Sequence, residues 1–138
     1  THVKKESHIQ VIDGDEVEIF SYSANMQDKN DENLAYQLTY NYVGDLKSDR
    51  EIKKLFDDQN EYWLSAGNAV LEYENVIDLN GIPGRNLYLT VDNSKVKMSI
   101  KVYYYKGLFY RLVVVTPEGN LFNKSISKFL DSFKILDK

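Results

Sequence analysis

Residues 81 to 133 decide the fold class; they open with Gly81-Ile82-Pro83-Gly84-Arg85 and close with Phe129-Leu130-Asp131-Ser132-Phe133. The opening motif is predicted to be a turn, because Pro83 presets one backbone dihedral angle and Gly84 permits a positive one. Between the two motifs, apolar and polar residues alternate, as they do in β-strands whose successive side chains point to opposite faces. The block therefore predicts three strands followed by a closing helix.

The clearest alternation lies at residues 96–105, and Lys106-Gly107 after it predicts a two-residue hairpin loop. With such a loop, Tyr105 pairs with Leu108, which sets the register of the whole hairpin. The other predicted pairs are Met98 with Val115, Ser99 with Val114, Ile100 with Val113, Lys101 with Leu112, and Tyr103 with Tyr110. The returning strand, residues 108–116, is apolar on both faces and is predicted to lie inside the sheet.

Period-two patterns upstream predict further strands, and eleven tyrosines and six phenylalanines against two prolines agree with a sheet-rich protein. These strands are expected at residues 9–11, 17–23, 34–42, 71–79 and 86–91. Asp13-Gly14 predicts the turn of a hairpin near the start of the chain. The polar stretch 25–33 has almost nothing to bury and is expected to be an exposed loop.

Two helices are predicted from apolar residues at helical spacing. Ser48 with Glu51 three residues later is a capping box, which marks the start of the first helix. Its stripe comprises Ile52, Leu55, Phe56, Gln59, Trp63 and Ala66, and Gly67 follows as a C-terminal cap. The second helix is predicted at Leu121–Phe133, with Phe122, Ile126, Phe129, Leu130 and Phe133 as its stripe.

These elements predict an α+β fold in one domain that spans residues 1–138, with residues 1–7 as a flexible tail. The fold is an antiparallel β-sheet of about six to seven strands with an α-helix on each side, an α/β/α sandwich. Both faces of the predicted hairpin carry apolar residues, so each face requires a cover, and the chain supplies two amphipathic helices.

Composition excludes some classes of function. Seventeen basic and twenty-one acidic residues leave a net charge of −4, opposite to the charge of a typical nucleic-acid-binding domain. No apolar run approaches the roughly 20 residues of a membrane helix, and no signal peptide is visible. Since the chain begins at Thr1 rather than Met, an N-terminal segment is expected to have been removed, and it could have carried a lipid anchor.

The motif at residues 81–85, the run Tyr110-Arg111-Leu112 and the closing motif at residues 129–133 together resemble the PsbP-like superfamily. That superfamily includes the extrinsic photosystem subunit and many bacterial secreted proteins and lipoproteins. The resemblance covers about residues 8–136 in element order and implies a binding or assembly role outside the cytoplasm. The photosystem role is not carried over, because no cofactor-binding residue of that subunit matches a position here. Tyr42-Val43 also departs from the Tyr-Pro of bacterial relatives.

Residues for catalysis or metal binding are scarce. The only imidazoles, His2 and His8, lie near the N-terminus, and the absence of cysteine excludes thiolate ligands. The acidic stretch 28–33 lacks the glycine and the glutamate of an EF-hand loop and is predicted to be a solvated loop. No phosphate-binding or nucleophile motif occurs. We therefore expect no cofactor and no metal.

The remaining candidate is an interaction surface formed by five residues of one face of the hairpin: Lys97, Lys101, Tyr103, Tyr105 and Tyr110. Tyrosine combines rigid contact area with a hydroxyl, so this group could bind a peptide or a glycan. The alternative is that these side chains pack under a helix, which the two-sided burial of the sheet already explains.

Two functions follow as hypotheses. The first is a non-enzymatic binding or assembly module of the bacterial cell envelope, periplasmic or tethered to a membrane, whose partner is a protein or a small ligand. The second is a hydrolase or small-ligand enzyme that uses carboxylates and tyrosines. A deep pocket with a carboxylate beside a tyrosine would favour the second hypothesis.

Overall fold

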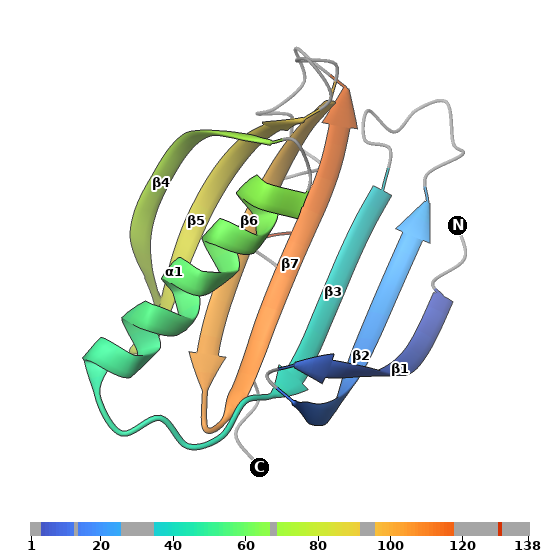
Figure 1. Cartoon of the computed structure of the whole chain (residues 1–138). Helices are drawn as coiled ribbons and strands as arrows, with labels where there is room; N and C mark the ends of the chain where they lie inside the picture. Colours follow the sequence, from blue (N-terminus) through green and yellow to red (C-terminus); the bar gives the residue numbers. More distant parts are fainter. Residues whose placement is uncertain are drawn as a thin grey trace.

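The structure, a computed structural model, describes residues 4–12, 14–25, 35–66, 69–91, 96–117 and 130. This part of the chain forms a seven-stranded antiparallel sheet in the order β1-β2-β3-β7-β6-β5-β4, with one helix across one face (Figure 1). The elements are β1 (Lys4–Ile12), β2 (Asp15–Asn25), β3 (Ala35–Tyr42), α1 (Asp49–Ala66), β4 (Val70–Leu79), β5 (Ile82–Val91), β6 (Val96–Tyr105) and β7 (Leu108–Pro117). The α1 connection carries the chain from β3, inside the sheet, to β4 at its far edge.

The β6–β7 hairpin confirms the register that the sequence predicts. Lys106 and Gly107 have φ angles of 47° and 86°, as expected for a two-residue turn that suits the twist of the two strands. Tyr105 pairs with Leu108 and Tyr103 with Tyr110. β7 lies between β6 and β3, inside the sheet, as predicted. Its apolar residues are buried on both faces, Phe109 and Val113 on one and Leu112 and Val114 on the other.

The prediction of a turn at Gly81–Arg85 is correct for Gly81 and wrong for residues 82–85. The chain turns at Asn80 and Gly81, whose φ angles are 53° and 90°, and β5 begins at Ile82. Pro83, Gly84 and Arg85 therefore lie in a strand that is hydrogen-bonded on both sides. Gly84 does not have a positive φ angle. The reason predicted for a glycine at this position, a backbone conformation that other residues avoid, is therefore wrong.

Helix α1 begins as the capping box predicts. The Ser48 hydroxyl accepts a hydrogen bond from the Glu51 amide at 3.2 Å and donates to the Glu51 carboxylate at 3.4 Å. Phe56, 2% exposed, is buried against the sheet, and its neighbours Ile52, Leu55 and Trp63 are partly buried with it. The predicted stripe thus faces the sheet, whereas the expected cap Gly67 lies outside the described residues.

The core has two parts, one on each face of the sheet. On the α1 face, Phe56 packs with inward residues of β5, β6 and β7: Leu87, Leu89, Ile100, Val102, Tyr104, Phe109 and Val113. On the opposite face, Tyr36, Tyr103, Leu112 and Val114 pack with Leu130. Within the described residues the structure shows one helix, α1, and not a helix on each side of the sheet. The second helix was expected at Leu121–Phe133, where Leu130 is the one described residue.

The N-terminal region differs from the predicted flexible tail. Residues 4–7 belong to β1, which pairs with β2 from Lys4 opposite Ser23 to Ile12 opposite Asp15. The predicted loop at residues 25–33 lies outside the described residues except for Asn25, the last residue of β2. In the described ranges, α1 is too polar to cross a membrane.

Candidate functional site

The five residues of the predicted interaction surface all lie on the face opposite α1. Lys97, Lys101, Tyr103 and Tyr105 alternate along β6, and Tyr110 of β7 is opposite Tyr103. The predicted grouping is therefore correct as a matter of strand register. Its members differ in how far they reach the surface.

Tyr103 is buried, and Lys97 is hydrogen-bonded to a neighbouring strand. Tyr103 is 3% exposed and packs with Leu130 and Leu112. The Lys97 ammonium donates to the Thr90 hydroxyl at 2.6 Å, and this hydroxyl donates to the Glu72 carboxylate at 2.5 Å. The hydrogen bond from Thr90 and the charge of Lys97 lower the pKa of Glu72. Neither of these two residues therefore offers a free side chain to a partner.

Lys101, Tyr105 and Tyr110 are half-buried and keep part of their side chains at the surface. Burial raises the pKa of the Tyr110 hydroxyl, and the neighbouring Tyr105 adds to this shift. The Lys106 ammonium lies 5.2 Å from the centre of the Tyr105 ring, a cation–π contact. Tyr110 is also the last member of a larger aromatic surface, and Lys101 and Tyr105 lie on the same face.

That larger surface is an aromatic row, which we define as Phe20, Tyr22, Tyr40 and Tyr110. Its ring centres are 5.1 Å apart for Phe20 and Tyr40, 6.3 Å for Tyr22 and Tyr40, and 5.8 Å for Tyr40 and Tyr110, and all three pairs are stacked. Desolvation raises the pKa of Tyr40, as does a hydrogen bond with Tyr22. Pairing of β2, β3 and β7 assembles the row from three separate segments of the sequence.

Sequence reasoning missed this row, although Phe20, Tyr22 and Tyr40 have the alternation of one strand face. Period two tells which residues share a face within a strand. It does not tell that β2 lies beside β3, or that β3 lies beside β7. The aromatic residues of each segment were visible in the sequence. The order of the strands, which brings these residues together, was not.

Exposed apolar side chains continue the aromatic row toward the edge of the sheet. Ser7 is opposite Phe20, so the odd-numbered residues of β1 share the face of the row. Ile9 and Val11 on this face are each 66% exposed, and Tyr42, two residues from Tyr40, is 59% exposed. Exposed apolar side chains that gather on one face are typical of a site that contacts another molecule.

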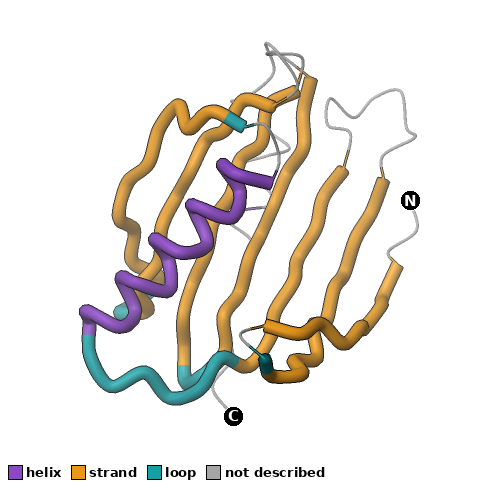
Figure 2. Tube along the Cα trace, in the orientation of Figure 1, coloured by secondary structure: helices purple, strands orange, loops and turns teal. Residues whose placement is uncertain are grey.

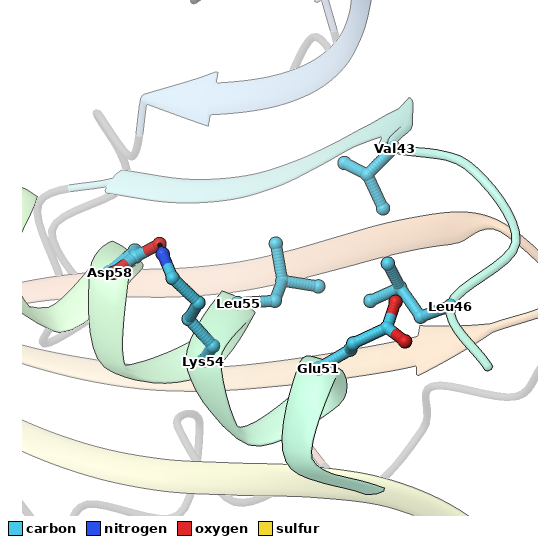
Figure 3. A pocket seen from close by; sticks show the side chains of 6 residues that line it. All are labelled: Val43, Leu46, Glu51, Lys54, Leu55 and Asp58. Carbon is cyan, nitrogen blue, oxygen red and sulfur yellow. Dashed lines mark hydrogen bonds and ion pairs between the residues drawn. The ribbon is translucent and has the colours of Figure 1, made fainter. Parts of the chain in front are cut away.

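Helix α1 borders a shallow groove on the opposite face of the sheet (Figure 3). Leu55 points toward Val43 and Leu46 of the loop before the helix, and the groove has a volume of about 250 Å³. Its charged rim is partly self-neutralised, because the Lys54 ammonium lies 2.7 Å from the Asp58 carboxylate. The groove has no tyrosine among its lining residues.

A second groove of about 250 Å³ lies on the other side of α1 and is also lined without tyrosine. Asp49 and Lys53 of the helix face Val76 and Arg85 of the sheet across it. Neither of these two grooves places a carboxylate beside a tyrosine, the arrangement that would favour the enzymatic hypothesis. A further hollow at the β1–β2 edge of the sheet includes both Glu6 and Tyr22 among its lining residues. Within the described ranges, no three His, Asp or Glu side chains gather as metal ligands.

Comparison with known proteins shows similarity at the level of the fold. No protein-family model matches the chain, and no curated protein matches it. A crystal structure of a Pseudomonas aeruginosa protein of unknown function, PA94, described as a putative regulator, superposes with a TM-score of 0.63. It has 8% identity over 96% of this chain and 99% of that chain.

The solution structure of cyanobacterial PsbP (CyanoP) from Synechocystis matches with a TM-score of 0.47 and 12% identity, over 91% of this chain and 88% of that chain. At these identities the likeness concerns the fold alone.

Proposed function

We propose that this chain is a non-enzymatic binding or assembly module of the bacterial cell envelope that recognises a partner protein through its aromatic face. We define the aromatic face as Ile9, Val11, Phe20, Tyr22, Tyr40 and Tyr42. The observation that carries the proposal is that three of these side chains, Ile9, Val11 and Tyr42, are more than half exposed beside a stacked aromatic row.

The composition of the aromatic face suits a protein partner. Stacked rings present rigid contact area, so little side-chain entropy is lost when they are covered. Charged residues adjoin the apolar ones: Glu16 is opposite Val11, Glu18 is opposite Ile9, and the Lys5 ammonium lies 5.5 Å from the centre of the Tyr22 ring. Glu18 of β2 thus lies inside the face, between Ile9 of β1 and strand β3, so a partner would place polar or basic groups among its apolar contacts.

The proposed location outside the cytoplasm rests on the resemblance of the sequence motifs to exported PsbP-like proteins. Its test is to express the gene from its native start codon with a C-terminal tag and to fractionate the cells. We expect the protein in the membrane or periplasmic fraction. Recovery in the cytosol, from a gene whose first thirty codons hold neither a signal sequence nor a lipid-attachment cysteine, would contradict this location.

We also infer that a second helix at Leu121–Phe133 covers the face of β6 and β7 opposite α1. The support is Leu130, which is 6% exposed and packs with Tyr103, Leu112 and Val114. Backbone chemical shifts of residues 121–133 test the inference, and helical values are expected. A cover at this position would leave β1, β2 and β3 on one side of the helix and the exposed β4 edge on the other as the open parts of this face.

The binding proposal is tested with charge substitutions at exposed apolar positions, which leave the interior intact. Partners are cross-linked to the tagged protein in intact cells and identified after capture with the wild type, Ile9→Lys and Val11→Lys. The matched controls are Val70→Lys and Val76→Lys on β4, where the side chains are 62% and 74% exposed.

We expect a partner whose recovery falls at least about tenfold with Ile9→Lys or Val11→Lys and is unchanged with the β4 controls, since a buried unpaired charge is costly in an interface. Thermal unfolding of each variant verifies the fold. The proposal fails if no captured protein depends on Ile9 and Val11, or if the β4 controls reduce recovery equally.

A further inference from the structure

The face of the sheet that carries α1 is apolar under the helix and more polar on the strands beside it. Helix α1 crosses β5, β6 and β7, whereas β2 and β3 lie beside it (Figure 1). On β2 and β3 this face holds the buried Ile19 and a polar strip, which we define as Ser21, Ser23, Gln37, Thr39 and Asn41. Ser21 and Asn41 are 7% and 3% exposed. The strip therefore combines burial with neutral hydrogen-bonding groups.

Arg111 of β7 borders the polar strip, opposite Thr39 of β3. Its Nε donates to the Thr39 hydroxyl at 2.8 Å, and its Nη2 donates to the Asn41 side-chain oxygen at 2.7 Å. The guanidinium carbon lies 4.9 Å from the centre of the Phe109 ring. A guanidinium has five N–H groups, so three have no bond to a described residue. Two side chains and a ring thus fix the group while much of its donor capacity is unused.

The charge of Arg111 has no carboxylate partner in the described part of the chain. Glu6 lies in the same row of the sheet, but β2 and β3 separate it from β7, and its carboxylate is 2.7 Å from the Lys4 ammonium. Desolvation lowers the pKa of Arg111 to about 10. A cation that is desolvated and bonded only to neutral groups is unfavourable, and an anion beside it would offset this cost.

We propose that Arg111 and the polar strip bind the carboxylate of a small organic ligand. The guanidinium fork matches the two oxygens of a carboxylate, and Thr39 and Asn41 hold the fork in place. Within the described strip Arg111 is the single cation, so a monoanion is neutralised, whereas a phosphate would keep about one unpaired charge. Tyr62 of α1, 56% exposed, acts electrostatically on the pKa of Arg111, and we expect its ring to contact the body of the ligand.

This site lies on the face opposite the aromatic face and does not depend on the proposed partner. Its test is an NMR titration of the ¹⁵N-labelled full chain with sodium acetate, sodium benzoate and sodium phosphate, with chloride used to equalise the ionic strength. We expect saturable shifts of the Thr39 and Asn41 amides and of the Arg111 Nε resonance. Benzoate is expected to bind more tightly than acetate, and phosphate most weakly.

Arg111→Lys tests the role of the fork, since an ammonium cannot bind a carboxylate in the bidentate manner. We expect the affinity for benzoate to fall at least about tenfold. The matched control is Arg85→Lys, because Arg85 lies on the same face, on the other side of Val102, with its guanidinium 5.3 Å from the Phe56 ring. Thr39→Val provides a second variant of similar volume, with an expected loss of about threefold.

The wild-type titration decides the proposal even if a variant does not fold. Shifts that do not saturate, or that spread evenly over surface lysines and arginines, would overturn it. Tighter binding of phosphate than of benzoate would overturn the carboxylate assignment. Arg85→Lys keeps the positive charge, so an equal loss of affinity with this variant would show that the effect is not specific to the Arg111 site, and it would also overturn the proposal.

Discussion

The ring of Tyr103 lies on the backbone of Gly84, its partner across β5 and β6. A Cβ atom at position 84 would be 2.7 and 2.9 Å from two carbons of this ring and 2.6 Å from the Val102 carbonyl oxygen. Glycine weakens a strand because it has no side chain to pack, and an aromatic ring from the neighbouring strand fills that space. The glycine and the tyrosine therefore act as one packing unit.

Gly84→Ala is expected to destabilise the protein by about 1–3 kcal/mol, the usual cost of overpacking. The added Cβ would clash both with the Val102 carbonyl oxygen, which cannot move without disturbing the ladder, and with the Tyr103 ring, which has to be displaced. Only the second part of the cost depends on Tyr103. Urea unfolding measures the loss. In a Tyr103→Leu background the same substitution should cost less, and an equal cost in both backgrounds would show that the ring is not responsible.

The hydroxyl of Tyr104 connects three backbone groups at one end of the sheet. It accepts hydrogen bonds from the Leu46 amide at 2.8 Å and the Gly107 amide at 3.2 Å, and donates to the Gly44 carbonyl at 2.9 Å. The loop before α1 and the β6–β7 turn meet at this point (Figure 2). Tyr104 is 6% exposed, so these bonds are shielded from water.

Tyr104→Phe is expected to lower the free energy of unfolding by about 1–3 kcal/mol, because two amides lose their acceptor while the ring stays. Hydrogen exchange of the Leu46 and Gly107 amides should accelerate more than exchange within β6. Tyr62→Phe on exposed α1 is the control and should change neither measurement. Unchanged exchange at Leu46 would contradict the role of the hydroxyl.

The carboxylate of Glu72 is expected to titrate below its ordinary pKa, because Thr90 donates to it and Lys97 is positively charged. A folded-state pKa below the unfolded value stabilises the protein at pH values above the unfolded pKa. This contribution is lost as the pH falls through the folded pKa. NMR titration of the wild type and Lys97→Met checks it. The variant should have the higher Glu72 pKa, and an identical pKa would exclude Lys97 as a cause.

Ser48→Ala is expected to lower the free energy of unfolding by about 1 kcal/mol, because the Glu51 amide loses its side-chain acceptor. Ser65→Ala near the other end of α1 is the matched control. Its hydroxyl bonds to the Glu61 carbonyl, which already belongs to the helix, so a smaller effect is expected. A Ser65→Ala loss as large as that of Ser48→Ala would argue against a specific cap.

Local patterns predicted those elements of the fold that depend on neighbours in the chain. The capping box placed the start of α1, and the Lys106-Gly107 loop set every pair of the β6–β7 hairpin. The same kind of reasoning failed at Gly84. A glycine after a proline suggests a turn, but here the absence of a side chain serves a contact with Tyr103 on another strand.

The candidate site was predicted in part for the same reason. Alternation along β6 and β7 grouped Lys97, Tyr103 and Tyr110 on one face, and the structure places them there. Alternation did not reveal that Tyr103 is buried or that Lys97 bonds to Thr90. It also left Tyr40 and Tyr110 in unrelated segments, although their ring centres are 5.8 Å apart.

By itself, the sequence determined the positions of most strands and of helix α1, and which side chains share a face, because periodicity, capping and turn chemistry act within a few residues. It did not identify residues 4–7 of β1 or 82–85 of β5 as strand. The tertiary structure decided the strand order. That order assembles the aromatic row from β2, β3 and β7, and it places Arg111 between Thr39 of β3 and Val102 of β6. Pairing between distant segments depends on packing of the whole sheet, which no local pattern encodes. The segment at residues 81–133 specified a sheet, and the fold determined which parts of its two faces remain open to another molecule.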